Sequence, residues 1–280
     1  MEAVAPFGAY PTPRWLRRAS DMSASGETRL WRYLCRKFMV RIIKNWARPF
    51  DVEVDGVKLR LYPTDNLHDR MTFVHRELPA AKWCGRLFPP HDGEFFFVDI
   101  GANVGVFTLR AIAHYGDLAR ILAIEPHPVM RERLRANVAL NHSAVRIESV
   151  AVGDRCGDMI LSQPSDSNFG LTSLHPDAGG DRARAAYTVT VDTLVAILAR
   201  NGVRRIDLLK IDIEGYEDRA LVPFFKSAPR SLWPRRIFIE HDQAARWEVD
   251  VMNTLCDCGY VIVDRDQSDA LLSLADATDA

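Results

Sequence analysis

The stretch Phe95-Phe-Phe-Val-Asp-Ile-Gly-Ala-Asn-Val-Gly105 decides the fold of this chain of 280 residues. Its first part is apolar apart from one acid and is closed by glycine, a pattern typical of a buried parallel strand with both faces covered. Gly101 and Gly105 allow turn dihedrals that other residues avoid, and they let the backbone approach a ligand without a Cβ in the way. The stretch therefore predicts a strand that ends in a ligand-binding turn.

A helix is expected directly after this turn. Residues 106–115 have helical spacing, so the turn leads into a helix N-terminus whose free N–H groups can meet a carboxylate or a hydroxyl-rich ligand. A dinucleotide fingerprint needs G-x-G-x-x-G, whereas the spacing here is G-x-x-x-G with Asn103 inside it. With Asp99 two residues before Gly101, the D-x-G-x-x-x-G form resembles motif I of class I S-adenosylmethionine-dependent methyltransferases. The alternative is a purely structural turn between strand and helix.

Two further strand ends carry acids. Residues 120–125 predict an apolar strand ending in Glu125, whose carboxylate can accept hydrogen bonds from both hydroxyls of a ribose. The alternative for Glu125 is an N-terminal acid on the following helix, favoured by the helix dipole. Residues 145–152 are a third buried-strand candidate that closes with a Gly-Asp pair. Asp154 can receive the amino group of an adenine there, or the pair can be an ordinary turn.

The segment Asp207-Leu-Leu-Lys-Ile-Asp-Ile-Glu-Gly-Tyr-Glu217 combines a strand with clustered charge. Period-two alternation puts Lys210, Asp212 and Glu214 on one side and apolar residues on the other. Three charges at the carboxyl end of a strand are costly unless they face a cleft or each other. Because ligands of open α/β sheets bind outside the carboxyl ends of the strands, we expect this cluster to face the same crevice as the glycine turn. A salt-bridged strand end without chemistry is the alternative.

Taken in order, the motifs of the chain resemble the FkbM family of methyltransferases. They are V-D-I-G-A-N-V-G, I-E-P, N-V-A-L-N, A-V-G-D, S-N-F-G-L-T-S-L, T-V-D-T-L, L-L-K-I-D-I-E-G-Y-E and I-F-I-E-H, and they cover roughly residues 62–241. The resemblance implies a Rossmann-like class I methyltransferase fold of the α/β class, with a mostly parallel doubly wound sheet. It also implies S-adenosylmethionine as cofactor and O-methylation of a hydroxyl on a sugar, polyketide or related metabolite. Val191 stands where the family usually has leucine, and the segment before residue 50 lies outside the shared pattern.

The candidate cofactor and catalytic residues come from these motifs. The predicted cofactor contacts are Asp99, Gly101, Asn103, Gly105, Glu125 and Asp154. Because the methyl group of a sulfonium is already electrophilic, the protein has to align a hydroxyl with it and remove the proton. Asp212 is the first candidate base, and His241 is the second because histidines titrate near neutrality. Lys210 is expected to orient the substrate or to depress a neighbour's pKa.

Other polar residues are expected to contact the acceptor, a small-molecule or glycan hydroxyl. The predicted substrate contacts are Glu214, Glu240, Asn168 and Ser173. The last two belong to a polar insert at residues 161–187, and long loops inside compact domains are usually functional or disordered. As an alternative, Asp212, Glu240 and His241 could hold a magnesium- or manganese-type ion, since oxygen and imidazole ligands suit such ions. We predict a site without a metal.

Composition narrows the class of protein. With 48% hydrophobic residues the chain can build one large α/β domain plus an extension, and a net charge of -1 disfavours a nucleic-acid binder held by phosphate contacts. Five irregularly spaced cysteines support neither a zinc site nor a disulfide framework. Because the chain shows neither a signal-peptide pattern nor a long apolar run, the cytoplasm is the expected compartment.

Three regions are expected along the chain: a basic, partly helical extension at residues 1–50, a hairpin and helical cap at 51–92, and the methyltransferase domain at 93–275. Residues 30–46 predict an amphipathic basic helix that either packs on the protein or a partner subunit, or lies on an anionic membrane surface. Residues 51–62 alternate around an Asp-Gly pair, which predicts the hairpin.

The remaining predictions concern the end of the chain and competing functions. Strands are expected at residues 236–240, 260–263 and 270–274, the last of them antiparallel, and Asp192 is the expected N-cap of a helix over 193–200. A nicotinamide-dependent oxidoreductase and a non-catalytic nucleotide-binding module are the alternative functions. The oligomeric state stays open.

Overall fold

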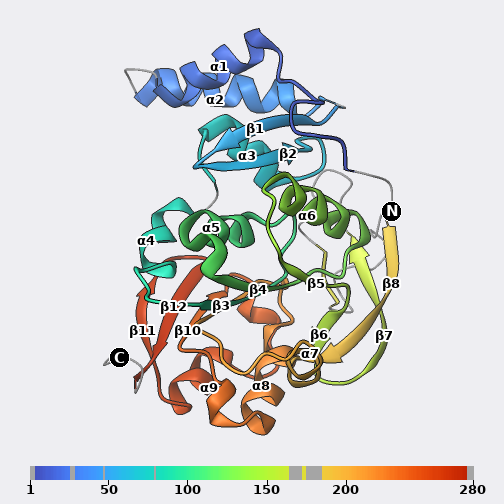
Figure 1. Ribbon diagram of the computed structural model, residues 1–280, viewed down its shortest axis with the longest axis vertical. Coiled ribbons are helices and arrows are strands. Elements are labelled where there is room, and N and C mark those ends of the chain that lie inside the picture. Colours follow the sequence, from blue (N-terminus) through green and yellow to red (C-terminus); the bar gives the residue numbers. More distant parts are fainter. Residues whose placement is uncertain are drawn as a thin grey trace.

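A computed structural model describes residues 4–25, 29–46, 48–78, 80–163, 172–174 and 185–275. The predicted substrate contact Asn168 lies outside these residues. The described chain forms an α/β domain with a layer of helices and a hairpin at one end (Figure 1).

The domain is built on a sheet of seven strands in the order β11-β12-β10-β9-β3-β4-β5. The strands are β3 (Phe95–Ile100), β4 (Ala119–Ile124), β5 (Arg146–Glu148), β9 (Leu208–Ile211), β10 (Arg236–Glu240), β11 (Tyr260–Arg265) and β12 (Asp269–Leu274). Neighbouring strands from β5 to β10 run parallel, while β12 is antiparallel to both β10 and β11. The predicted mostly parallel sheet with an antiparallel last strand is confirmed.

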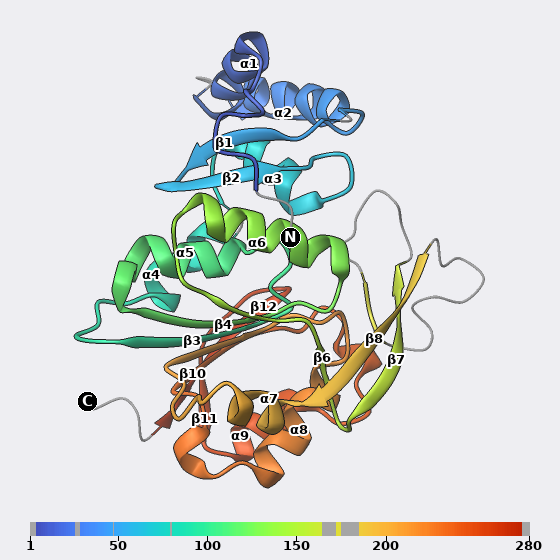
Figure 2. The ribbon, with the colours of Figure 1, turned by 45° about the vertical axis from the view of Figure 1, so that its right-hand side comes forward.

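Helices cover both faces of this sheet (Figure 2). One face carries α5 (Val106–Tyr115) and α6 (Pro128–Leu140), and the other carries α7 (Leu194–Arg200), α8 (Glu217–Ser227) and α9 (Val251–Asp257). Alternate residues of β3 enter different cores: Phe97 packs with residues of α5, whereas Val98 packs with residues of α7 and α8. Burial on both faces explains why this strand is apolar without alternation.

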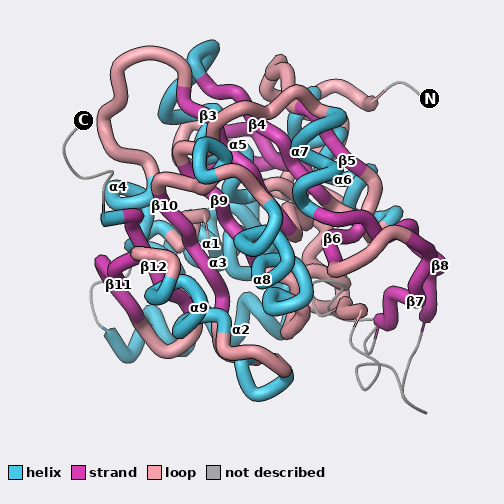
Figure 3. Tube along the Cα trace, turned by 90° about the horizontal axis from the view of Figure 1, so that it is seen from below, coloured by secondary structure: helices cyan, strands magenta, loops and turns pink. Residues whose placement is uncertain are grey.

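The apolar stretch at residues 145–152, predicted as one strand, is two strands. After β5 the chain leaves the main sheet, and β6 (Ala151–Gly153) joins β7 (Gly157–Gln163) and β8 (Ala185–Thr193) in a second sheet. Figure 3 shows β7 and β8 at one side of the molecule, away from β11 and β12. Composition cannot reveal the bend, because Ala151 and Val152 are as buried in the second sheet as they would be in the first.

The helix after β8 is capped by Thr193, so the prediction of Asp192 as its N-cap is wrong. Thr193 Oγ1 accepts a hydrogen bond from the Ala196 backbone N–H at 3.3 Å. Asp192 lies within β8 and forms an ion pair with Arg200. Both residue types favour N-caps. The helix begins at Leu194, one residue later than predicted, because β8 extends through Thr193, and Thr193 is therefore the residue that caps it.

The N-terminal layer contains two helices, a hairpin and a cap helix. They are α1 (Arg14–Ser25), α2 (Arg29–Ile43), β1 (Phe50–Val54), β2 (Val57–Leu61) and α3 (Leu67–His75). The hairpin prediction is confirmed: β1 and β2 pair antiparallel around Asp55 and Gly56, whose φ angles of 52° and 79° suit a tight hairpin turn. Helix α1 was not predicted.

The hairpin is fastened to α6 by two asparagines. Asn137 Oδ1 accepts from the Arg60 backbone N–H at 2.8 Å, and Asn141 exchanges two hydrogen bonds with the Lys58 backbone at 2.9 and 2.7 Å. The side chains satisfy the outer edge of β2, which would otherwise expose unpaired backbone groups. The layer and the domain are therefore packed together.

The remaining elements are short. They are η1 (Ala81–Trp83), α4 (Cys84–Leu87), η2 (Gly116–Leu118), η6 (Arg230–Leu232) and η7 (Ala244–Arg246). None of the described helices combines the length and the apolar character that crossing a bilayer requires.

Candidate active site

A cavity of about 260 Å³ lies at the carboxyl ends of β3, β4, β9 and β10. Six of the predicted site residues line it: Gly101, Asn103, Glu125, Asp212, Glu214 and Glu240. The wall also includes Leu67 and His68 of α3, the loop after β10, and residues of the second sheet such as Val152 and Leu161. The sheet and the cap therefore both contribute to one pocket.

The two glycines of the turn permit close packing of the chain against itself. At Gly101, which has a φ of 72°, a Cβ would lie 1.9 Å from the backbone oxygen of Asp212. At Gly105, with a φ of 93°, a Cβ would lie 2.6 Å from Leu134 Cδ1. The positive φ angles confirm the turn dihedrals predicted for both glycines, and at Gly101 the close approach of the Asp212 backbone is a further reason for glycine.

Asp99 stabilises the glycine turn through hydrogen bonds from Thr108, and its side chain does not line the cavity. Its Oδ2 accepts hydrogen bonds from the backbone N–H and the hydroxyl of Thr108, at 3.1 and 2.7 Å. Its Oδ1 lies 3.7 Å from Lys210 Nζ. The carboxyl group is fully buried, and burial raises its pKa even though Lys210 opposes the shift. Asp99 therefore ties the end of β3 to the first turn of α5.

Glu125 lines the cavity with both oxygens held by backbone groups. Oε2 accepts from the Asn103 N–H at 2.7 Å and Oε1 from the His127 N–H at 2.8 Å. Burial raises the pKa of this carboxyl group to about 7, against the effect of these hydrogen bonds. The orientation of the carboxyl group is therefore set by the protein before any ligand arrives, while each oxygen keeps a further lone pair.

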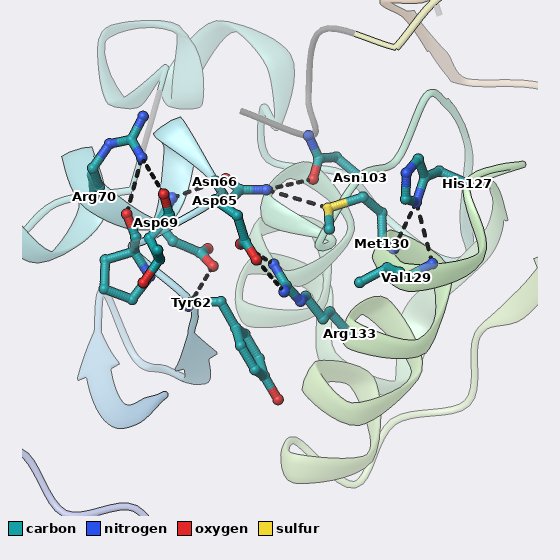
Figure 4. A network of polar contacts seen from close by, with 12 residues as sticks. Tyr62, Asp65, Asn66, Asp69, Arg70, Asn103, His127, Val129, Met130 and Arg133 are labelled. Carbon is teal, nitrogen blue, oxygen red and sulfur yellow. Dashed lines mark hydrogen bonds and ion pairs between the residues drawn. The ribbon is translucent and has the colours of Figure 1, made fainter. Parts of the chain in front are cut away.

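The cap is fastened beside Glu125 by a polar network (Figure 4). Asn66, the N-cap of α3, donates to Asn103 Oδ1 at 2.9 Å. Arg133 of α6 binds Asp65 through two hydrogen bonds of 2.6 and 2.9 Å and lies over the ring of Tyr62. A bidentate pair fixes both partners in position. The network holds the start of α3 over the glycine turn.

Asp212, Glu214 and Glu240 form a compact cluster of acids in the same cavity. One oxygen of each lies within 4.8 Å of the others. The predicted alternation through Glu214 is wrong, because β9 ends at Ile211 and Glu214 has a left-handed φ of 58°. The acids meet through a turn instead of along one face of a strand.

The acids of this cluster differ in their protonation. Burial and the charge of Asp212 raise the pKa of Glu240 to about 11 and that of Glu214 to about 8. Burial alone would raise the pKa of Asp212 as well, but Lys210 and a hydrogen bond from Glu240 outweigh it and lower this pKa. The raised pKa values favour the protonated forms of Glu214 and Glu240, and the lowered pKa favours the ionised form of Asp212.

Lys210 connects the acid cluster to the glycine turn. The residue is 3% exposed, and its Nζ lies 3.4 Å from Asp212 Oδ2. It also donates to the backbone oxygen of Gly101 at 2.7 Å. Lys210 does not line the cavity, and its contacts are with Asp212 and the glycine turn.

A protein-family model matches the part of the sequence that carries most of this site. The model of the methyltransferase FkbM domain matches residues 99–262, which is more than half of the chain. The chain belongs to the FkbM methyltransferase family. The matched residues run from Asp99 into strand β11, so they contain the strands β4, β5, β9 and β10 and the acid cluster.

Two curated methyltransferases are similar to part of the chain. A protein of Streptomyces tacrolimicus named 31-O-demethyl-FK506 methyltransferase FkbM is 30% identical over 164 residues, covering 49% of this chain and 60% of its own length. Methyltransferase sdnD of Sordaria araneosa is 31% identical over 149 residues, covering 44% of this chain and 57% of its own length. The matches therefore span about three fifths of these relatives.

A solved structure of an FkbM methyltransferase from Methylobacillus flagellatus KT is also similar. It shares 13% sequence identity with this chain at a TM-score of 0.45, and the match covers 87% of this chain and 59% of that one.

A histidine other than the expected one lines the cavity, and it comes from the cap and not from the matched FkbM domain. The second candidate base, His241, lies outside the cavity lining, and Arg265 Nε lies 3.1 Å from its Nε2. His68, at the start of α3, lines the cavity instead. Burial lowers the pKa of His68 although the charge of Asp212 opposes the shift, so the imidazole is neutral at neutral pH. Nothing in the local sequence singled out His68 except its place in the predicted cap.

Two other predicted contacts, Asp154 and Ser173, do not line the cavity, although Thr172 and Leu174 on either side of Ser173 do. Asp154, expected beside an adenine, forms an ion pair with Arg219 at 3.2 Å on the surface near α8. Ser173 is 1% exposed and its hydroxyl donates to the Glu214 backbone oxygen at 2.9 Å. Ser173 therefore shapes the loop that carries Glu214.

Several oxygen ligands are available to a cation. Within the described residues, Asp212, Glu214 and Glu240 are the acids close enough to share an ion. The metal alternative included His241, which lies apart from this group. Lys210 already supplies a positive charge beside Asp212.

Proposed function

We propose that this chain is an S-adenosylmethionine-dependent methyltransferase that methylates a hydroxyl group of a sugar, polyketide or related small metabolite. Membership of the FkbM family supports methyl transfer. The observation that carries the proposal is the joint position of Glu125 and Asp212 in one cavity, where one carboxyl group is pre-oriented and the other is ionised. A nucleoside donor and a hydroxyl acceptor need groups of these two kinds.

Glu125 and the glycine turn fit the nucleoside of the donor. The carboxyl oxygens that keep a free lone pair can accept from the two ribose hydroxyls. Apolar residues beside Glu125, namely Ile124, Val152 and Leu161, offer a surface for the adenine ring. When bound, S-adenosylmethionine supplies the electrophilic methyl group, and the role of the chain is to orient the acceptor and to remove its proton.

The acid cluster and His68 fit the acceptor. A hydroxyl that donates to the Asp212 carboxylate is held in place, but the lowered pKa of Asp212 makes it a weak base. His68 is neutral and lines the same cavity, so its imidazole can accept the proton of the hydroxyl. The charge of Asp212 then stabilises the imidazolium that forms.

The protonation of the cluster favours a hydroxyl acceptor over an ammonium group. Glu214 and Glu240, with pKa values raised to about 8 and about 11, are neutral at neutral pH and can donate or accept hydrogen bonds. The charges of Lys210 and Asp212 compensate each other at 3.4 Å. A neutral hydroxylated metabolite therefore meets a site of matching polarity with little net charge.

The test combines ligand binding with turnover. Calorimetry of the full chain with S-adenosylmethionine, S-adenosylhomocysteine and NAD should give saturable heat for the first two ligands only. A screen of hydroxylated metabolites for S-adenosylhomocysteine release should then yield an acceptor. Binding of NAD without the sulfonium would favour the oxidoreductase alternative. Binding of the sulfonium without turnover on any hydroxyl, while an amine is methylated, would refute O-methylation.

A further inference from the structure

The two N-terminal helices form a layer at the end of the molecule away from α8 and α9 (Figures 1 and 2). Their inner sides are buried against the hairpin: Leu16 of α1 and Met39 and Ile43 of α2 are at most 1% exposed. The amino-acid sequence predicts that this helix packs on the protein or a partner subunit, or lies on a membrane surface. Packing on the protein therefore explains one apolar side of α2.

A second apolar side of α2 faces outward. Leu30, Leu34 and Phe38 are 67%, 52% and 64% exposed, and their spacing of four residues places them along one stripe of the helix. This stripe is called the outer face of α2. Trp15 of α1 and Trp31 are also about half exposed, at 53% and 48%. Contiguous exposed apolar side chains on a protein surface mark an interaction site.

Exposed cations occur on α2 itself and on the neighbouring parts of the N-terminal layer. The exposed basic residues of this part of the chain are Arg14, Arg17, Arg18, Lys37, Arg41, Lys44 and Arg48. Between residues 11 and 50 the sequence has two acids, Asp21 and Glu27, and Asp21 forms an ion pair with Arg76 at 3.4 Å. This end of the molecule is strongly basic although the whole chain has a net charge of -1.

We propose that the outer face of α2 and its flanking cations bind the surface of an anionic lipid bilayer. An amphipathic helix of this kind lies in the plane of the interface, with apolar side chains among the acyl chains and cations at the phosphates. This arrangement removes the exposed apolar side chains from water and pairs the exposed cations with anions. A nucleic acid would engage the cations but leave Leu34 and Phe38 in water. A second copy of the chain would bring two basic surfaces together, which costs electrostatic energy.

Sedimentation of the full chain with lipid vesicles tests this proposal. One vesicle contains phosphatidylcholine alone, and the other contains equal parts of phosphatidylcholine and phosphatidylglycerol. We expect binding to the anionic vesicle only, weakened by added salt because exposed charges are screened.

Two double variants, each with a matched control, test the apolar and the cationic contribution to binding separately. Leu34→Ser with Phe38→Ser should abolish sedimentation, while the control Val261→Ser with Val263→Ser, on the exposed edge of β11, should not. Lys37→Gln with Arg41→Gln should weaken binding by about fivefold for each cation removed. The matched control Arg204→Gln with Lys226→Gln, at exposed positions elsewhere, should retain binding.

Three results would overturn the proposal: equal binding to both vesicles, binding to neither, or equal losses in variants and controls. Analytical ultracentrifugation adds a further outcome, since a dimer that Phe38→Ser dissociates would assign the outer face to a second copy. Thermal unfolding is followed for every variant. An unchanged melting temperature shows that the variant is folded and keeps this result independent of the proposed function.

Discussion

The ammonium group of Lys210 lies 3.4 Å from the carboxylate of Asp212. Lys210 belongs to the central strand β9, and Asp212 directly follows that strand. The same ammonium group donates to the Gly101 carbonyl at 2.7 Å. A buried cation between acids removes the cost of leaving their charge uncompensated. The glycine turn and the acid cluster, which are far apart in the sequence, are therefore one electrostatic unit, and changes in either are expected to affect the other.

Replacing Gly101 tests the packing of the turn. Gly101→Ala would place a Cβ 1.9 Å from the Asp212 backbone oxygen at a φ of 72°. Because backbone has to move, we expect the free energy of unfolding in urea to fall by about 3 kcal/mol or more. Gly202→Ala is the matched control, since its φ is 65° but no heavy atom lies within 4 Å. It should cost about 1 kcal/mol. Equal losses would show that the contact with Asp212 is unimportant.

Glu125 is expected to make donor binding depend on pH. Its carboxyl group has a pKa of about 7, and only the ionised form accepts hydrogen bonds at every oxygen lone pair. Affinity for S-adenosylhomocysteine should therefore rise between about pH 6 and about pH 8. Glu125→Gln should weaken binding about tenfold at the upper pH and remove this dependence.

Calorimetry across the pH series measures the effect. Glu132→Gln, on the exposed side of α6, is the control and should bind like the unmodified protein. A Glu125→Gln protein with normal affinity would exclude a role for this carboxylate in donor binding.

The buried acid Glu240 is expected to destabilise the protein as the pH rises. Its pKa is raised from 4.5 to about 11, so the folded state holds the proton more tightly than the unfolded state. That stabilisation is complete below the ordinary pKa and is lost as the pH rises toward the folded value. Glu240→Gln keeps a neutral group there, and its advantage in thermal stability should grow from about pH 5 to about pH 9. Glu53→Gln, exposed on β1, is the comparison. An advantage that shrinks with pH would contradict the raised pKa.

His68 and His241 can be separated by kinetics once an acceptor is known. His68→Asn should lower the rate of methyl transfer about a hundredfold while leaving donor affinity unchanged, because it removes the proposed proton acceptor. His241→Asn should retain most activity, since His241 lies outside the cavity lining.

The pH profile provides a second measurement of His68. Protonation of its imidazole should reduce the rate on the acid side, with a midpoint below the ordinary value of 6.5. His68→Asn should lose this limb. An unchanged profile would return the role of base to Asp212.

Elements encoded by neighbouring residues could be predicted from the sequence. The strand, glycine turn and helix from Phe95 onward are present, and so is the hairpin around Asp55 and Gly56. The family was also recognisable, because its motifs are short runs of adjacent residues. Such patterns depend on backbone dihedrals and on which side of one element is buried, and both are local properties.

Contacts between distant elements could not be predicted in this way. Glu125 and Asp212 could be assigned to strand ends from the sequence, because each acid directly follows an apolar strand. By contrast, the three-dimensional fold brings His68 of the cap into the cavity wall and Asp154 next to Arg219. It also decided which acids are protonated, since desolvation and the charges of neighbours act through space and not along the chain.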